Sequence, residues 1–396
     1  MRMNLQRTER GAGELKRGTQ LSIRVTSHAA DDFEMEFTAG GLPSVRSPRN
    51  QPIQVEEYSR SGARIIKLLS GLLILTQLGC SKTPAEELRT ESFQGMCDAS
   101  AIVALNSDLF VAGDDEDSVM RVFSRSRGSV SVHQYNLAPF LRFGANDEAD
   151  LEGSTRIGDR LYWITSHGNN RKGKEQESRQ RFFAITVPTN AGNVRIEPVG
   201  QPYTRLLDDL IAEPAMRQFN LHAALSLPPK TPGALNIEGL TATAEGHLLL
   251  GFRNPVPRGK ALLVPLLNPS DLLEGKPPKF GAPRLIDLGG YGVRSIERWR
   301  DGYLIIAGSI DGKGKSRLYH WDGGEDAPQI QDVDFAGINP EALSIIDRDG
   351  TPELLVVSDD GTRKVNGVEC KQLKDPMQKS FRAMVVPIAP HLAAKP

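Results

Sequence analysis

Residues 151–166 read LEGSTRIGDRLYWITS, and the fold follows from this stretch. An acidic residue and a glycine enter a short strand, a Gly/Asp turn follows, and a second, apolar run ends in a polar loop. The same order recurs at intervals of roughly 45 to 85 residues, in copies that begin at Cys97, Ile237, Val293 and Pro340. Short repeated strands broken by turn residues are typical of a β-propeller, so the sequence predicts an all-β fold with five blades.

Each copy continues with a third strand and a weaker fourth, as in residues 181–187 and 194–199 of the second copy. Because neighbouring strands are antiparallel, the residue that enters the first strand lies at the same end as the loop that leaves the second. One face of the propeller therefore gathers these residues around the central channel. The stretch between Val199 and Asn236 has room for a degenerate sixth blade, yet residues 206–225 show helical apolar spacing, which predicts a lid or a buttress.

The composition limits the classes of partner. The chain has 396 residues and a formal net charge of −1, and no basic stripe stands out, which argues against nucleic acid. A hydrophobic fraction of 39% and an aromatic fraction of 6% fit a soluble globular protein. We expect a monomer.

The N-terminal part contains a predicted export signal over residues 61–79, with basic flanks and an apolar centre of about a dozen residues. This centre is too short for a membrane-spanning helix. Its end resembles a bacterial lipoprotein box, which predicts a lipid anchor on Cys80, although Gln77 stands where that box usually has leucine. The alternatives are an ordinary signal peptide and a buried apolar segment.

The signal also divides the chain. Residues 1–60 are expected to be a disordered extension or the product of a mis-assigned translation start, residues 80–94 a tether, and residues 95–390 the propeller. We expect the protein on the periplasmic side of the bacterial cell envelope, held to the membrane by its lipid alone, or secreted if Cys80 carries no lipid.

Two further cysteines bracket the propeller. Cys97 opens the first blade and Cys370 lies in the last, and a closed propeller brings its first and last segments together. In an oxidising envelope a disulfide between them is expected. Two buried free thiols are the alternative.

The position that enters each blade is acidic in four copies out of five. Several acids near one axis repel one another unless a cation, a proton or backbone amides offset them. Hard oxygen ligands favour calcium or magnesium, so Ca²⁺ is the first metal expected, with the acidic run 114–117 as a weaker second site. The alternative is that each acid accepts backbone hydrogen bonds and holds one blade to the next. The predicted metal ligands are Asp98, Glu152, Glu238 and Glu341, and Arg294 occupies the fifth position.

The adjoining loops carry groups that suit an anionic substrate. Arginine binds phosphate or carboxylate with paired hydrogen bonds, which favours Arg253 and Arg294 as binding residues, with Asn254 and Lys172 beside them. His167 is the candidate proton donor or base, although a histidine in a loop is also commonly structural. No serine hydrolase elbow and no zinc protease motif is present in the sequence.

Four segments carry a family resemblance: residues 150–153 (DLEG), 162–167 (YWITSH), 237–240 (IEGL) and 251–255 (GFRNP). They resemble the signature of a bacterial family of exported proteins of unknown function, over about residues 95–388. More distantly, the chain is similar to phytase-like and esterase-like propellers. In propeller phytases calcium at the channel mouth holds phosphate and activates water, so this resemblance implies metal-assisted hydrolysis. Arg294 departs from an all-acid ring, which leaves the number of metal sites open.

Two functions follow as hypotheses. The first is a binding platform on the cell envelope that recognises a small anionic ligand, or an envelope protein or glycan. The second is a calcium-assisted hydrolase of phosphoesters or similar anionic esters. The lack of a catalytic motif favours the binding platform and leaves enzymatic activity an open question.

Overall fold

The computed structural model describes residues 88–388 apart from 145–146, 191–192, 336 and 349, and the backbone of three strands nearer the N-terminus. The chain divides into two compact units, Met1–Ala85 and Glu86–Pro396. In the first unit an antiparallel sheet has the order β1-β2-β3, with the bounds β1 (Leu21–Ala29), β2 (Asp32–Ala39) and β3 (Val45–Arg46). This sheet lies within residues 1–60, the segment for which a disordered extension or a mis-assigned start is expected.

The export segment 61–79, Cys80 and most of the tether lie outside the described residues. Among the helices that the structure describes, none is long and apolar enough to cross a membrane.

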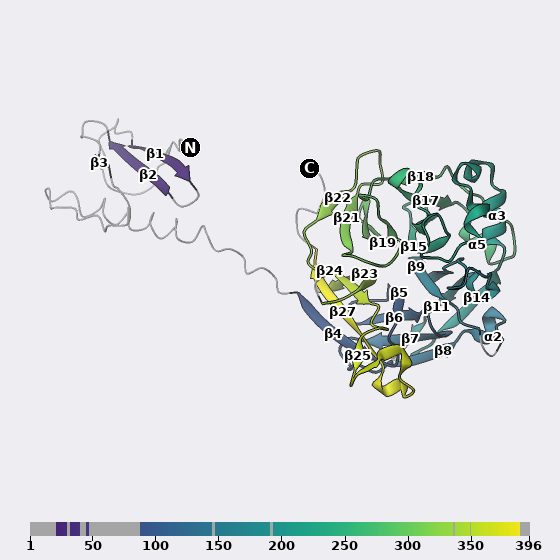
Figure 1. Cartoon of the computed structure of the whole chain (residues 1–396). Helices are drawn as coiled ribbons and strands as arrows, with labels where there is room; N and C mark the ends of the chain where they lie inside the picture. Colours follow the sequence, from purple (N-terminus) through teal and green to yellow (C-terminus); the bar gives the residue numbers. More distant parts are fainter. Residues whose placement is uncertain are drawn as a thin grey trace. The chain divides into compact units, whose positions relative to one another are not determined.

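The second unit is a five-bladed propeller, as the repeats predict (Figure 1). Each blade is a four-stranded antiparallel sheet. Blade 1 contains β5 (Ala99–Ala104), β6 (Leu109–Asp114), β7 (Val119–Ser124) and β8 (His133–Asn136). Blade 2 contains β9 (Leu151–Ile157), β10 (Arg160–Thr165), β11 (Phe182–Thr186) and β14 (Glu197–Tyr203). Blade 3 contains β15 (Asn236–Ala242), β16 (Leu248–Asn254), β17 (Ala261–Leu266) and β18 (Arg284–Ile286).

The last two blades complete the ring. Blade 4 contains β19 (Gly292–Trp299), β20 (Gly302–Gly308), β21 (Arg317–Trp321) and β22 (Gln329–Gln331). Blade 5 contains β23 (Pro340–Arg348), β24 (Thr351–Ser358), β27 (Ser380–Pro387) and β4 (Arg89–Gln94). The first strands of successive blades contact one another in a closed circle, β5 to β9, β15, β19, β23 and back to β5. These strands therefore surround the central axis.

Blade 5 closes the propeller with a strand from the other end of the domain. β4 precedes blade 1 in the chain but pairs with β27, with Phe93 opposite Phe381. A disulfide joins Cys97 to Cys370 beside this seam, with 5.9 Å between the Cα atoms. Two connections, one of hydrogen bonds and one covalent, thus hold the first and last segments together.

The stretch after Val199 holds no sixth blade. After β14 it forms α3 (Leu206–Ala212), η3 (Pro214–Phe219) and α4 (Leu221–Ala224). Leu206, Leu210 and Met216 are buried in the same apolar cluster as residues of blades 2 and 3. The helical spacing is therefore confirmed, and the segment packs as a buttress between these two blades.

The remaining short elements lie in loops. They are α2 (Ala138–Leu141), η2 (Glu177–Arg179), β12 (Thr189–Asn190), β13 (Asn193–Val194), η4 (Pro257–Gly259), α5 (Pro269–Leu272), β25 (Lys364–Val365), β26 (Val368–Glu369), η5 (Cys370–Gln372) and η6 (Pro376–Gln378).

Packing between blades explains the apolar runs of the sequence. Successive side chains of a strand point to opposite faces. On β10, Tyr162 and Ile164 belong to the cluster shared with blade 3, whereas Leu161 and Trp163 belong to the cluster shared with blade 1. Because both faces of the strand are buried, the run is continuously apolar and does not alternate with polar residues.

The glycine after the entry acid has a packing role. A Cβ atom on Gly153 would lie 2.9 Å from both Ile164 Cγ2 and Leu240 Cβ. A Cβ atom on Gly239 would lie 2.7 Å from Val293 Cγ1. The Glu-Gly pairs of blades 2 and 3 therefore combine a channel-lining acid with the close approach of the next blade.

Candidate functional site

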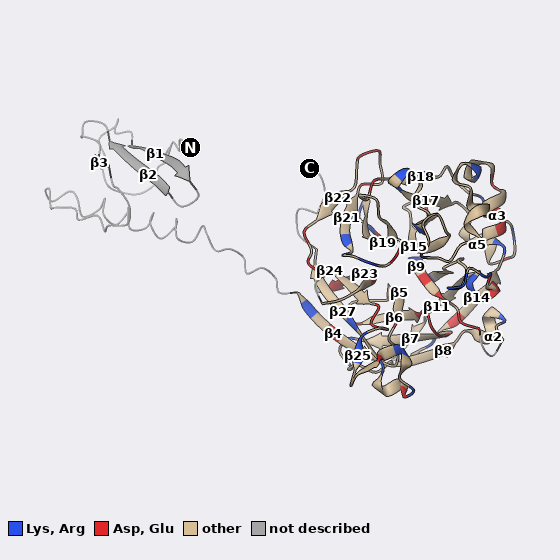
Figure 2. Ribbon diagram, viewed as in Figure 1, with Lys and Arg blue, Asp and Glu red and all other residues tan. Residues whose placement is uncertain are grey.

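The acidic residues that enter four of the five blades fall into two groups around the channel. Carboxylate oxygens of Glu152, Glu238 and Glu341 lie within 4.8 Å of one another, and we name these three residues the channel cluster. Asp98 is instead grouped, by the same distance, with Asp114 and Asp115, and we name these three the seam cluster. Figure 2 shows acidic and basic residues close together near the middle of the propeller.

Arg253, near the end of β16, is bound inside the channel. Its Nη1 donates a hydrogen bond to Glu238 Oε1, and its Nε donates to the carbonyl oxygen of Ser309 at 3.1 Å. Asn236 Nδ2 also donates to Glu238 Oε1, at 2.8 Å. Arg253 is buried, and burial opposes its charge while the Glu238 carboxylate raises its pKa above the ordinary value.

Arg294 connects three blades. Its Nη2 pairs with Glu341 Oε2, its Nη1 donates to Asn339 Oδ1 at 3.1 Å, and its Nε lies 3.7 Å from Glu238 Oε2. Arg294 therefore links acids of blades 3 and 5 in one ion-pair network. The prediction that Arg253 and Arg294 grip an external anion needs correction, because both guanidinium groups are buried and already bound to glutamates.

Glu152 differs from the other two acids of the channel cluster. No described residue donates a hydrogen bond to its carboxylate, and it forms no ion pair with them, although it is only partly exposed. Burial, and after it the charge of Glu238, raises the pKa of Glu152 well above its ordinary value. Glu238 Oε2 is also buried and accepts no hydrogen bond within the described part of the chain. Unsatisfied carboxylate oxygens thus face one another here.

The seam cluster is a similar concentration of buried acids. Burial and the neighbouring Asp114 raise the pKa of Asp98 to about 8. Burial and the charge of Asp117 raise the pKa of Asp114 to about 7. Burial raises the pKa of Asp115 well above its ordinary value, with Asp114 the largest charge contribution.

His167 is unsuited to the predicted role of proton donor. The ring is buried, the backbone has a φ of 53°, and Nδ1 lies 2.8 Å from the Thr165 carbonyl oxygen. Because a carbonyl only accepts, Nδ1 carries the proton. Burial lowers the pKa of His167 to about 4, so the imidazole is neutral near pH 7. These contacts favour the structural alternative that the sequence left open.

Asn254 and Lys172 do not complete an anion site with the arginines. Asn254 Nδ2 donates to the carbonyl oxygens of Pro229 and Thr231 at 2.9 and 2.7 Å, and its Oδ1 accepts from Gly233 at 3.2 Å. Its amide therefore holds the loop that precedes β15. Lys172 is exposed, and the structure gives its side chain no contact with the channel cluster.

Three polar residues of the site were missed at the sequence level. Asp150, Asn236 and Asn339 each lie two positions before the entry acid of their blade. Asp150 pairs with Arg179 at 3.1 Å, and Asn236 and Asn339 contact Glu238 and Arg294 as described above. This repeated column was visible in the sequence. Arg179 was not, because it lies on η2 inside a long loop that has no counterpart in the other blades.

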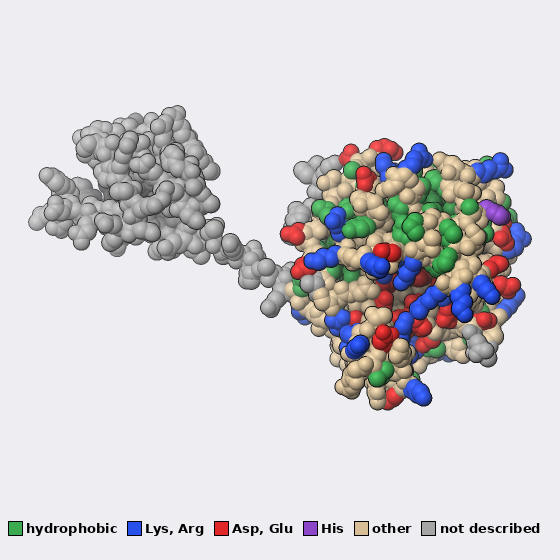
Figure 3. Space-filling view, viewed as in Figure 1, with side chains coloured by type: hydrophobic (Ala, Val, Ile, Leu, Met, Phe, Trp, Pro, Cys, Tyr) green, Lys and Arg blue, Asp and Glu red, His purple; other side chains and the backbone are tan. Residues whose placement is uncertain are grey.

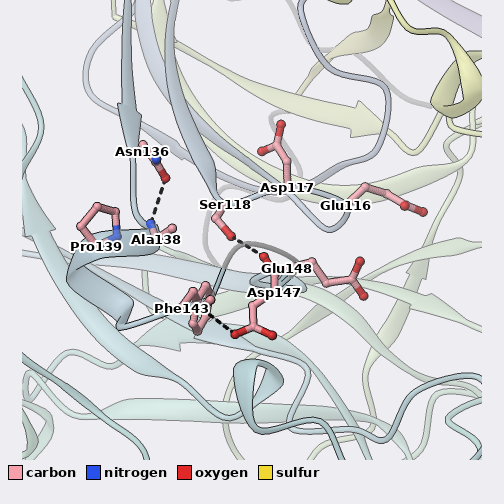
Figure 4. A pocket seen from close by; sticks show the side chains of 10 residues that line it. Glu116, Asp117, Ser118, Asn136, Ala138, Pro139, Phe143, Asp147 and Glu148 are labelled. Carbon is pink, nitrogen blue, oxygen red and sulfur yellow. Dashed lines mark hydrogen bonds between the residues drawn. The ribbon is translucent and has the colours of Figure 1, made fainter.

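A pocket of about 590 Å³ opens beside blade 1 (Figure 4). Its lining includes the acids Glu116, Asp117, Asp147 and Glu148. Each of these acids has a partner: Lys371 for Glu116, Arg121 for Asp117, the Gly144 amide for Asp147, and Arg179 for Glu148. The pocket is thus acidic, but each of its acids already has a partner within the protein. It adjoins the seam cluster because Glu116 follows Asp115 in the chain.

The molecular surface shows the same charge arrangement. In Figure 3, Asp and Glu side chains gather near the middle of the visible face, with Lys and Arg side chains in a band beside them.

A family model named DUF3616, with the description "protein of unknown function", matches residues 98–187 and 199–367. This match covers more than half of the chain and includes every residue of both clusters. No curated protein matches the chain.

Three solved structures illustrate the spatial likenesses of the chain. The PQQ-bound aldose sugar dehydrogenase of Streptomyces coelicolor has 10% identity and a TM-score of 0.37, over 76% of this chain and 99% of that one. The arabinanase Arb43A of Bacillus subtilis has 11% identity and a TM-score of 0.37, over 76% and 98%. A mutant Trypanosoma rangeli sialidase with trans-sialidase activity has 11% identity and a TM-score of 0.36, over 69% and 44%. Likenesses this weak carry no information about the activity of this chain.

Proposed function

This chain belongs to the DUF3616 family, and we propose that it is an exported binding platform. Its channel cluster takes up a divalent cation, and the cation in turn binds an anionic ligand. The ligand is a small anion or an anionic group on an envelope protein or glycan. Among the predicted metal ligands, Glu152, Glu238 and Glu341 form this site, and Asp98 is not part of it because it belongs to the seam cluster.

The observation that carries this proposal is the open carboxylate of Glu152. Three glutamates face two arginines in the channel, and of the three only Glu238 and Glu341 pair with the arginines. One carboxyl group therefore remains without a basic partner, and it belongs to the most accessible of the three acids. A cation placed between these oxygens would relieve both the repulsion and the burial cost.

The donor set favours calcium and leaves room for a ligand. Ca²⁺ takes six to eight oxygen ligands, in flexible geometry. Three carboxylates with unsatisfied oxygens fit this preference but cannot fill the shell. Water and an anion would complete it, so the proposed ligand binds through the cation and not through Arg253 or Arg294.

Lys230 is a better candidate than the arginines for direct contact with the anion. Its side chain is exposed and forms no ion pair with any residue in the described part of the chain. It is close enough to the channel that burial and, after it, the charge of Arg253 lower its pKa. A free ammonium group at this place attracts an approaching anion.

Export and anchoring remain part of the proposal. The disulfide between Cys97 and Cys370 supports an oxidising compartment. We expect a monomer that is attached to the periplasmic side of the envelope through a lipid on Cys80, or secreted if that cysteine is not used.

Calorimetric titration of calcium into the chelator-treated full chain tests the cation site. Glu152→Gln is expected to lower the calcium affinity of the channel cluster by about tenfold or more, because it removes one carboxylate ligand. Glu325→Gln changes a fully exposed acid and serves as the matched control. Inorganic phosphate should then raise the Tm only when calcium is present. Binding that is identical in wild type and Glu152→Gln would contradict the proposal.

Calcium-assisted hydrolysis of phosphoesters is the second candidate function. The open carboxylates favour it, because a cation with free coordination positions can activate water. The burial of His167 weakens it, because the expected proton donor is neutral and enclosed. Turnover of p-nitrophenyl phosphate that needs calcium and is lost in Glu152→Gln would establish the enzyme, and no turnover in either protein would exclude this substrate.

A further inference from the structure

The seam cluster contains a buried acid with no basic partner. Asp98 immediately precedes β5, is 5% exposed, and forms a lone β-bridge with Asp359, which follows β24. The side-chain hydrogen-bond partner of its carboxyl group is another acid, Asp359, and no described residue donates to it from an amide, amine or guanidinium group. The charges that act on it most strongly are those of other acids, Asp114, Asp359 and Glu116.

The two neighbours of Asp98 in the cluster are also poorly compensated. Asp114, the last residue of β6, is buried, and its Oδ1 accepts a hydrogen bond from the Glu116 amide at 2.7 Å. Asp115 Oδ1 is buried and has no hydrogen-bond partner within the described part of the chain. Two of the nearby basic groups are engaged elsewhere, since Arg121 pairs with Asp117 and Lys371 with Glu116. Lys379 forms no ion pair with the cluster, and its charge is the smallest of the influences on Asp114. This contrasts with the channel cluster, where two arginines supply positive charge.

The backbone holds the Asp98 carboxylate in this position. The Asp115 amide donates to the Asp98 carbonyl oxygen at 3.3 Å, and the Asp360 amide donates to the Cys97 carbonyl oxygen at 3.0 Å. A Cβ atom on Gly361 would lie 1.6 Å from Asp98 Oδ1, so a larger residue at 361 would displace this carboxylate from its position. Segments from blades 1 and 5 thus fix the cluster at the seam that β4 and the disulfide also close.

We propose that the seam cluster is a second, separate divalent cation site, with Asp98, Asp114 and Asp115 as its ligands. Three carboxylates that offer oxygens within 4.8 Å of one another, without a paired base, suit calcium. The bound ion replaces the missing positive charge and ties the entry of blade 1 to the loop after β6. Because that entry also bridges to the end of β24, the ion stabilises the closed ring.

This inference does not depend on the channel site, and one experiment separates the two. Calcium is titrated by calorimetry into the full chain after removal of metal with a chelator. The wild type is expected to bind two equivalents. Asp98→Asn and Asp115→Asn are each expected to lose one equivalent and to keep the one that depends on Glu152. Asp159→Asn, in an exposed turn of blade 2, is the matched control and should keep both.

The thermal midpoint gives an independent readout. Calcium should raise the Tm of Glu152→Gln through the seam site, and this rise should be lost when Asp98→Asn or Asp115→Asn is added to Glu152→Gln. Asp115 is less buried than Asp98, so Asp115→Asn remains informative if Asp98→Asn does not fold. Stoichiometry and Tm response equal to those of wild type in Asp115→Asn would overturn the inference. If the wild type binds a single equivalent of calcium, and Glu152→Gln binds it equally well, the channel site is contradicted and the seam site is not.

Discussion

Arg294 on β19 pairs with Glu341 on β23, so a single guanidinium group joins blade 4 to blade 5 at the axis. The same side chain lies 3.7 Å from Glu238 of blade 3. The one basic residue in a ring of acids therefore neutralises part of that ring and connects three blades through it. The channel is both a structural centre and the place where uncompensated charge remains.

Replacing Arg294 by methionine tests the structural part of this role. Glu341 would remain buried without its partner, and breaking a buried ion pair costs about 3–5 kcal/mol. Urea denaturation should show this loss in the free energy of unfolding. In the double variant Arg294→Met with Glu341→Leu, part of the loss should be recovered because no unpaired charge stays behind on Glu341. Equal destabilisation by the single and double variants would argue against the pair as the cause.

Loss of the Cys97–Cys370 disulfide should destabilise the propeller. The bond joins two residues that are 273 positions apart and restricts the unfolded chain, and removing such a bond typically costs about 2–5 kcal/mol. The double variant Cys97→Ala with Cys370→Ala should therefore unfold at lower urea concentration. Wild type treated with reductant is expected to behave like this variant, and no effect of reductant would contradict the expectation.

His167 predicts a loss of stability in acid. Its pKa is lowered from 6.5 to about 4 in the folded protein, chiefly by burial. Between these values the unfolded chain binds a proton that the folded chain does not, so stability is full above pH 6.5 and is lost as the pH falls toward 4. The slope is at most about 1.4 kcal/mol per pH unit.

The variant His167→Asn isolates this contribution. Asparagine tolerates the left-handed backbone at this position, where φ is 53°. The difference in unfolding free energy between wild type and variant should shrink as the pH is lowered from 6.5 to 4. A difference that stays constant over this range would show that His167 does not titrate as described.

Gly153→Ala tests the packing role of the Glu-Gly pair. The added Cβ would meet Ile164 and Leu240 at 2.9 Å, in a core that has no free space there. Overpacking of this kind costs about 1–3 kcal/mol. Thermal unfolding should show a lower Tm, with calcium affinity retained if the acid keeps its place. An unchanged Tm would mean that the blades move apart without cost.

Much of the fold was predictable from the repeats. The second strand of each blade is a continuous apolar run, such as residues 161–164, because both of its faces pack against neighbours. Helical spacing over 206–225 identified the buttress for the same reason. The closing strand β4 was not predicted, because its pairing with β27 spans the whole domain and leaves no local pattern.

The site was predictable only in part. The alternation of antiparallel strands placed the entry acids and the loops at one end, as the two clusters demonstrate. It could not tell which charges pair, because that depends on distances of a few ångströms between side chains from different blades. Arg253 and Arg294 therefore looked like anion ligands, although Arg253 pairs with Glu238 and Arg294 pairs with Glu341. His167 looked accessible because its burial follows from tertiary packing and not from its neighbours in sequence.

The central claim is that the channel cluster binds a cation, and a crystal structure of the full chain grown with calcium tests it most directly. We expect an anomalous difference peak between Glu152, Glu238 and Glu341, with carboxylate oxygens at about 2.3–2.6 Å from it. Density for water alone between these three side chains, at a calcium concentration that saturates any binding seen in solution, would contradict the claim.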